Sequence, residues 1–127
     1  MPSTNLSNAK VEIGGLGSIV IINDLGDIPG GRTLDVSGVA SGTTTLKAGH
    51  ILIQKAADGS YAPLGVSGEA YATLPEGYTY AGVLKADVLV KDPRAAILTI
   101  GQVNAAASPY PVTAEIKEAL PRIQFLY

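Results

Sequence analysis

The chain has 127 residues, no cysteine and a formal net charge of −2 at pH 7, from eleven acidic and nine basic residues. The lack of cysteine excludes disulfides, thiolate catalysis and zinc sites built on cysteine. The basic residues are scattered singly, which argues against a nucleic-acid partner, and the length is enough for one domain with its own apolar core.

The first segment, residues 1–9, is polar and has Leu6 as its one sizeable apolar residue after Met1. It lacks the apolar stretch of a signal peptide, and the aliphatic run from Ile19 to Ile22 is far too short to cross a bilayer. We therefore expect a soluble protein without a membrane partner. Residues 1–9 should form a flexible arm, and residues 10–127 a single β-rich domain.

In the next residues, glycines separate short apolar runs, and this pattern favours strands. Lys10–Ile13 and Ser18–Asn23 are the first two expected strands. Between them Gly15-Leu16-Gly17 supplies two glycines of a dinucleotide fingerprint, but a strand-forming run follows where that motif needs a helix. Asn23, Asp24 and Asp27 lack the spacing of a calcium loop, so we interpret them as a surface turn.

A β-hairpin is the clearest local prediction, after a short strand at Thr33–Val36. Ile51, Leu52 and Ile53 place apolar side chains on both faces of its first strand, which predicts burial on both sides. Asp58-Gly59 predicts a two-residue type I′ turn, and the second strand of the hairpin should run from Tyr61 to Leu64. Ala48-Gly49 predicts a tight corner just before the hairpin.

Two further strands are expected downstream of a loop that covers residues 65–77 and contains a possible short strand at Ala70–Ala72. Tyr78–Val90 should bend or bulge at Gly82. Ala95–Val103 carries Ile97, Leu98 and Ile100 on both faces. This pattern indicates burial either between layers of the domain or between subunits, so these three residues are the predicted oligomer interface.

The C-terminal region has a helical pattern in place of the strand patterns before it. Thr113 is a suitable helix N-cap, Glu115 falls in the first turn, and Ile116 and Leu120 are one turn apart, so about two turns of helix are expected before Pro121. Residues 122–127 alternate and predict a closing strand. The fold class is therefore mainly β, a small barrel-like or sandwich-like domain with one short C-terminal α-helix.

Candidate catalytic and binding residues are few. His50 is the single histidine, so neither a His-pair metal site nor a convincing Ser-His-Asp arrangement can be assembled, and we expect it at the surface or partly packed. No nucleophile, base and orienting group can be named together, which favours a protein without catalysis, cofactor or metal. Surface tyrosines offer an alternative, a carbohydrate- or ligand-binding groove. Its candidate residues are Tyr61, Tyr71, Tyr78 and Tyr80.

A family resemblance covers residues from about Thr33 to Tyr127. The segments LKAGHILIQ, DGSYAPL, YTYAGVLKADVLV, AAILTIGQVN and EIKEALPRIQFLY resemble, in order and spacing, the head-decoration and head-fibre proteins of tailed bacteriophages. Two regions depart from the family pattern: Lys91–Arg94, and the glycine-rich part before Thr33. The residues that carry the similarity are Gly49, Gly59, Tyr61, Pro63, Gly82, Val103, Asn104, Ala119, Leu120, Ile123 and Phe125.

The resemblance implies a structural virion protein on the outer capsid surface, made in the host cytoplasm. Proteins of this family form homotrimers that clamp the major capsid protein after the head expands, and some carry a head-fibre protein. The N-terminal arm is their capsid contact. Carried over to this chain, the expected capsid-binding residues are Thr4, Leu6, Lys10, Val11 and Ile13.

Overall fold

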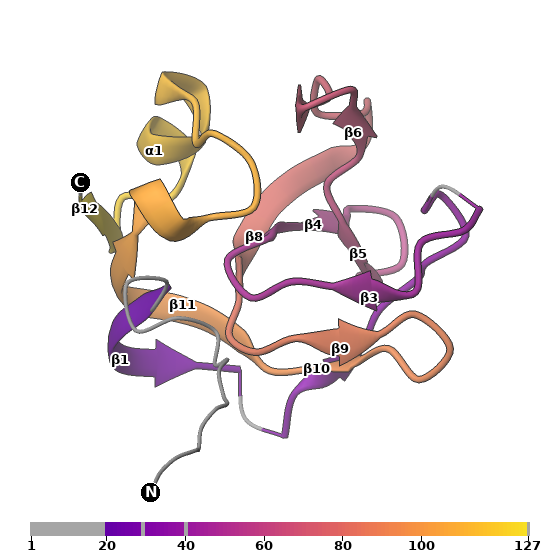
Figure 1. Ribbon diagram of the computed structural model, residues 1–127, viewed down its shortest axis with the longest axis horizontal. Helices are drawn as coiled ribbons and strands as arrows, with labels where there is room; N and C mark the ends of the chain where they lie inside the picture. Colours follow the sequence, from indigo (N-terminus) through magenta and orange to yellow (C-terminus); the bar gives the residue numbers. More distant parts are fainter. Residues whose placement is uncertain (1–19, 29, 40, 127) are drawn as a thin grey trace, which may run out of the picture.

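The computed structural model of the chain describes residues 20–28, 30–39 and 41–126. Strands make up most of the regular structure, and one short α-helix lies near the C-terminal end (Figure 1). The mainly β fold class is therefore confirmed. In the part of the chain that the structure describes, the sheets stay open and form no closed barrel.

One six-stranded sheet organises the domain. All of its neighbouring strands are antiparallel except the last, β12, which runs parallel to β11. The path through the sheet is β1 (Ile21–Asp27), β11 (Ile97–Asn104), β8 (Tyr78–Leu84), β4 (Ile51–Lys55) and β5 (Tyr61–Pro63), with β12 (Ile123–Leu126) beside β11.

Three short strand pairs surround this sheet. They are β2 (Arg32–Thr33) with β10 (Arg94–Ala95), β3 (Thr45–Leu46) with β9 (Val88–Leu89), and β6 (Val66–Ser67) with β7 (Ala70–Tyr71). The strand expected at Thr33–Val36 overlaps β2 at Thr33 alone, and the one expected at Tyr78–Val90 is divided into β8 and β9. The strand expected at Lys10–Ile13 lies outside the described residues.

Two apolar clusters pack on opposite faces of the central strands. Alternate residues of β4 belong to different clusters: Ile51 and Ile53 to one, Leu52 to the other. β8 and β11 divide in the same way, with Val83 and Leu98 in the first cluster and Leu84 and Ile97 in the second. Because successive side chains of a strand point to opposite faces, this arrangement produces the uninterrupted apolar runs of the sequence.

The two clusters change the interpretation of the predicted oligomer interface. Ile97 and Leu98 are 0% exposed within the single chain, and Ile100 is half-buried beside Gly26. Of the two alternatives left open by the sequence, burial between layers of the domain accounts for Ile97 and Leu98. Their apolar character therefore gives no support for subunit contact.

The predicted hairpin is present, but its turn differs from the prediction. β4 and β5 pair antiparallel, with Gln54 opposite Tyr61. The Lys55 N–H donates to the Ser60 carbonyl, and the Gly59 N–H donates to the Lys55 carbonyl, both at 2.8 Å. The connection is therefore four residues long, Ala56 to Gly59, rather than a two-residue type I′ turn. Gly59 keeps the positive φ that was expected, +76°.

The bulge expected near Gly82 is confirmed. The register between β4 and β8 shifts so that Leu52 faces Gly82 while Ile53 faces Tyr80, which leaves Ala81 as the extra residue. A Cβ on Gly82 would collide with the backbone carbonyl oxygen of Leu98. Glycine is thus required where β8 and β11 approach closely.

The C-terminal elements also match the prediction. Helix α1 (Ala114–Ala119) begins after Thr113, whose hydroxyl accepts from the Ile116 N–H at 3.3 Å. Ile116 and Leu120 join the first apolar cluster, as does Ile123 of β12. A 3₁₀ turn, η4 (Ala105–Ala107), precedes this region. The helix therefore covers one face of the sheet next to β11 and β12 (Figure 1).

A substitution at Gly59 tests the observed turn. We expect Gly59→Val to lower the free energy of unfolding by about 1–3 kcal/mol, because a β-branched residue is strained at positive φ. Gly59→Asn is the matched control, since asparagine tolerates this conformation and the Cβ position has no neighbour closer than 3.6 Å. Equal denaturation midpoints for the valine variant and the wild type would contradict the turn geometry.

Candidate functional site

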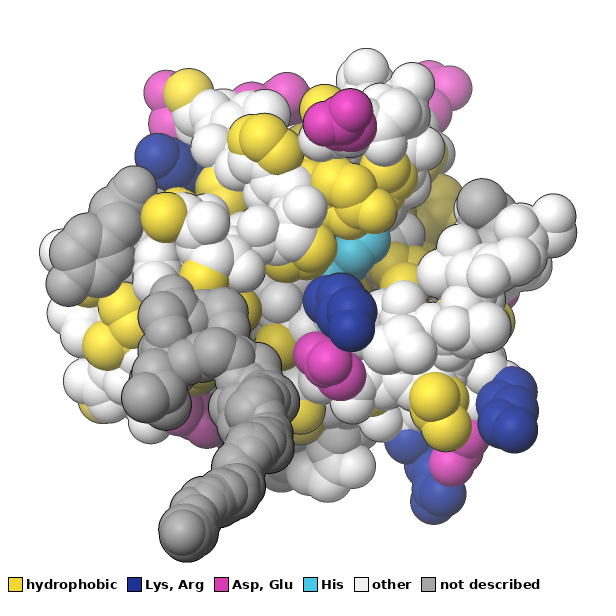
Figure 2. All heavy atoms as spheres, in the orientation of Figure 1, with side chains coloured by type: hydrophobic (Ala, Val, Ile, Leu, Met, Phe, Trp, Pro, Cys, Tyr) yellow, Lys and Arg dark blue, Asp and Glu magenta, His cyan; other side chains and the backbone are white. Residues whose placement is uncertain are grey.

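A cavity of about 430 Å³ opens beside the corner that leads from β3 into β4, and we call it the His50 cavity. Its walls come from four parts of the chain: the segment before β3 that contains Gly38 and Thr43, the corner itself, the connection from β5 to β6, and the segment before α1. In Figure 2 the single histidine is visible from outside at the bottom of a hollow among apolar side chains. The residues that line the cavity include Leu46, His50, Leu64, Val66, Pro109 and Tyr110.

His50 is nearly enclosed, with 5% of its surface exposed, although the sequence predicted a surface or partly packed position. Its Nε2 lies 2.8 Å from the Leu64 carbonyl oxygen. Because a carbonyl can only accept, Nε2 must carry the hydrogen, and Nδ1 of the neutral ring is then an acceptor. No residue in the described ranges hydrogen-bonds to Nδ1.

Burial keeps this ring neutral. Removal of solvent lowers the pKa of His50 below its ordinary value, and the hydrogen bond to Leu64 opposes that effect without overcoming it. At pH 7 the imidazole is therefore uncharged. The site presents an aromatic hydrogen-bond acceptor rather than a cation.

Two tyrosine rings hold the imidazole in place. Tyr71 and Tyr110 both meet it edge-on, with ring centroids 5.3 and 5.8 Å away. The Tyr71 hydroxyl accepts from the Ile51 N–H at 3.1 Å, and burial raises the pKa of Tyr71 to about 12. These contacts fix the ring on three sides, so His50 is a rigid part of the cavity.

The corner before β4 positions His50 through glycine. Gly49 has φ +94° and donates to the Leu84 carbonyl at 2.8 Å, as expected for the predicted Ala48-Gly49 corner. Asp87 braces the same corner from the β8–β9 connection by accepting from the Ala48 N–H at 2.7 Å. Lys47 lies 3.8 Å from the same carboxylate, so the charges at the rim of the cavity are balanced.

The tyrosines proposed for a carbohydrate groove are not brought together. Tyr71, Tyr78 and Tyr80 pack against the first apolar cluster, whereas Tyr61 packs against the second, on the opposite face of the sheet. All four are half-buried. Tyr110, which no sequence pattern indicated, lines the His50 cavity. The prolines on either side of it, Pro109 and Pro111, were the only sequence signal that this segment is irregular and could line a cavity.

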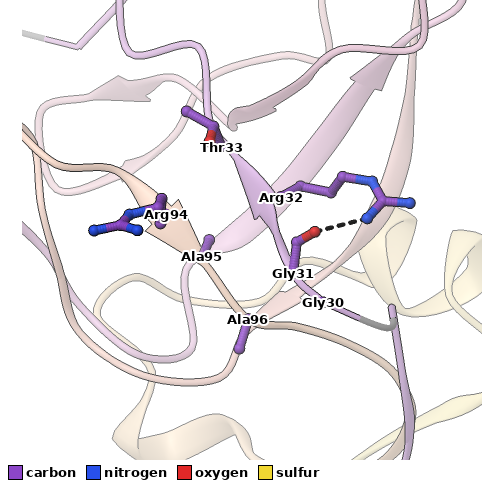
Figure 3. Close-up of a pocket in the computed structure, with 7 residues that line it drawn as sticks. All are labelled: Gly30, Gly31, Arg32, Thr33, Arg94, Ala95 and Ala96. Atoms are coloured by element: carbon purple, nitrogen blue, oxygen red, sulfur yellow. Dashed lines mark hydrogen bonds between the residues drawn. The ribbon is translucent and has the colours of Figure 1, made fainter.

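A second hollow, of about 450 Å³, lies along the β2–β10 pair and has an arginine from each strand (Figure 3). The two side chains extend away from each other. Arg32 donates to the Gly31 carbonyl at 2.7 Å, and Arg94 makes two bonds of 3.1 Å to Asp92. The arginines therefore do not converge on a common point where an anion would bind.

The acidic residues expected in a surface turn lie instead on strand β1. Asp24 and Asp27 both pair with Lys85 at the end of β8, the latter at 2.6 Å. These carboxylates raise the pKa of the Lys85 ammonium, Asp24 most strongly. Pairing with β11 overrides the local preference of Asn and Asp for turns. Within the ranges 20–28, 30–39 and 41–126, no three His, Asp or Glu side chains group as metal ligands would.

Strand β1 also exposes apolar side chains that the sequence analysis did not select. Ile22 is 42% exposed and Leu25 is 65% exposed. β1 is the last strand of its sheet, and among the described residues its outer edge pairs with no other strand. The predicted capsid-binding residues precede it and lie outside the described residues: Thr4, Leu6, Lys10, Val11 and Ile13.

Comparisons with protein-family models, with curated proteins and with solved structures found no match. In the described part of the chain, no helix has both the length and the apolar character needed to span a membrane.

The buried histidine predicts a pH-dependent stability. The folded-state pKa of His50 is depressed, so the unfolded chain takes up a proton that the folded chain excludes as pH falls below about 6.5. The free energy of unfolding should then decrease between pH 7 and pH 5, with a slope of at most about 1.4 kcal/mol per pH unit.

The control is His50→Gln, whose side-chain amide can donate to the Leu64 carbonyl but does not titrate. Urea denaturation of both proteins across this pH range should give a flatter profile for the variant. Parallel profiles would show that His50 does not exclude its proton.

Proposed function

We propose that the chain is a structural virion protein that binds the outside of the expanded bacteriophage capsid as a homotrimer, where it stabilises the shell or anchors a head fibre. The family resemblance of the sequence motivates this role. The structural observation that supports it best is the outer edge of β1, which pairs with no strand among the described residues and carries the exposed Ile22 and Leu25.

An open strand edge with apolar side chains favours contact with another chain. Unpaired backbone N–H and C=O groups can accept an added strand, and exposed apolar groups gain free energy when they are covered. Proteins usually protect such edges with charge, and Asp24 and Asp27 of β1 are themselves neutralised by Lys85. The edge is thus suited to assembly with a second copy or with a capsid subunit.

The surroundings of the one histidine support a role without catalysis. Its Nε2 bonds to a backbone carbonyl and its ring contacts are two tyrosines, and among the described residues no serine, threonine or carboxylate hydrogen-bonds to the imidazole. A general base needs such a partner within hydrogen-bond reach. This geometry favours a structural protein over a hydrolase.

Self-association should depend on the edge strand. In sedimentation experiments at micromolar concentration we expect a trimer, and Leu25→Asp should weaken association at least about tenfold, because a charge would be buried without a partner. Leu89→Asp is the matched control, since Leu89 is also exposed but lies on β9. A wild-type chain that stays monomeric at all concentrations would argue against the homotrimer.

Capsid binding should depend on the N-terminal segment. Deletion of residues 2–9 should leave thermal unfolding unchanged but reduce the density of the protein on expanded heads examined by electron cryo-microscopy. The physical reason is that this polar segment contributes too little apolar surface to stabilise the domain, while it can add to a partner's sheet. Full occupancy by the truncated protein would move the capsid contact elsewhere.

A ligand-binding role is the second candidate. The described residues do not form the predicted tyrosine groove, but the His50 cavity provides a concave site with an acceptor, Nδ1 of His50, that has no partner among the described residues. Cavities of about 300–1,000 Å³ with mostly apolar walls are typical of small-molecule sites.

A further inference from the structure

We propose that the His50 cavity binds a small, uncharged aromatic molecule that carries one hydroxyl donor, a ligand of the phenol class. This inference does not depend on the capsid role, because none of the described residues that line the cavity belongs to β1. It rests on the shape of the cavity, on the polar groups it offers, and on its charge balance.

The walls select an apolar ring. Leu46, Leu64 and Val66 supply aliphatic surface, and Pro109 and Tyr110 supply ring surface. With a volume of about 430 Å³, the cavity can hold a single substituted ring together with water. Besides His50 and Tyr110, the polar side chains of the lining are Thr43, Thr45 and Lys47, and Lys47 is already paired with Asp87. A sugar would need hydrogen-bond partners for several hydroxyls, so a ring with one hydroxyl is the better match.

The floor supplies the matching acceptor. The Nε2 hydrogen of His50 is committed to the Leu64 carbonyl, which leaves Nδ1 with a lone pair and without a partner among the described residues. Tyr71 and Tyr110 hold the ring edge-on, so this lone pair has a fixed direction. A phenolic hydroxyl is a donor of the right strength and size for such an acceptor.

The charge balance excludes an ion as the preferred occupant. Lys47, the basic residue at the rim, is paired with Asp87 at 3.8 Å, and that carboxylate also accepts from the Ala48 N–H. A carboxylate ligand would have to compete with Asp87 for Lys47, and an ammonium ligand would find no free carboxylate among the lining residues. A neutral ligand avoids both conflicts.

The test uses p-cresol as the probe and the full chain as the receptor. Because the chain has a single histidine, its ring nitrogens give unique signals in a long-range ¹H–¹⁵N spectrum. p-Cresol should shift the Nδ1 signal in a saturable way. A Kd in about the millimolar range is expected, because p-cresol is small and forms a single hydrogen bond in the cavity.

Two matched ligands test the hydrogen bond and the preference for a neutral ligand, and two variants test the location of the site. Toluene, which lacks the hydroxyl, should leave Nδ1 unshifted, and benzoate should bind more weakly than p-cresol. Gly38→Leu should weaken binding at least about tenfold, because Gly38 lines the cavity and a Cβ there meets no atom within 4 Å. Ala57→Leu, on the exposed β4–β5 turn, should have no effect.

The wild-type titration decides the proposal even if a variant fails to fold. Absence of a saturable Nδ1 shift with p-cresol would overturn it. Equal Nδ1 shifts with toluene would overturn the hydrogen bond to His50. Tighter binding of benzoate than of p-cresol would overturn the preference for a neutral ligand.

Discussion

The central strands of this domain are apolar on both faces, and everything else is arranged to cover them. Val83 and Leu84, adjacent on β8, contribute to different apolar clusters on opposite sides of the sheet. Each face therefore needs its own cover. Helix α1 covers one face, while the segment around Leu34 and the β3–β9 pair cover the other. A chain of 127 residues meets this demand without a second copy.

The His50 cavity lies where these two covers meet. Leu46 belongs to the second cluster and Leu64 to the first, and both line the cavity. The covers come from different segments joined by irregular connections, so their junction cannot interdigitate as completely as a continuous helix or sheet would. A polar ring with a backbone partner fits such a junction, since its hydrogen bond to Leu64 offsets the loss of solvent.

Local sequence signals predicted the strands, turns and helix themselves better than they predicted the contacts around each of these elements. The hairpin, the Gly82 bulge, the α1 cap at Thr113 and the closing strand follow from alternation, turn chemistry and capping, which act over a few residues. The length of the turn before Ser60 was missed because Asp-Gly is compatible with several loop lengths. The β1 strand through Asp24 and Asp27 was missed because its partner, β11, is remote in sequence.

The candidate site was the least predictable part. His50 alone gives no motif, and its burial depends on Tyr71 and Tyr110, which are separated from it and from each other along the chain. No spacing rule connects such residues. Only the close approach at Gly49, where a Cβ would lie 2.6 Å from Val20 Cγ1, had a visible trace in the sequence, as the Ala48-Gly49 corner.

The pairing of β1 with β11 has a consequence for how the molecule forms. The Thr99 hydroxyl donates to the Gly26 carbonyl across a separation of 73 residues, so the largest strand contact of the sheet closes a very long loop. Contacts of this kind slow folding, because loop-closure entropy is lost before the contacts are gained. The β4–β5 hairpin and the β4–β8 pair are local enough to form first. β1 should join late, and until it does, β11 is a temporary edge at which newly made chains are most prone to aggregate.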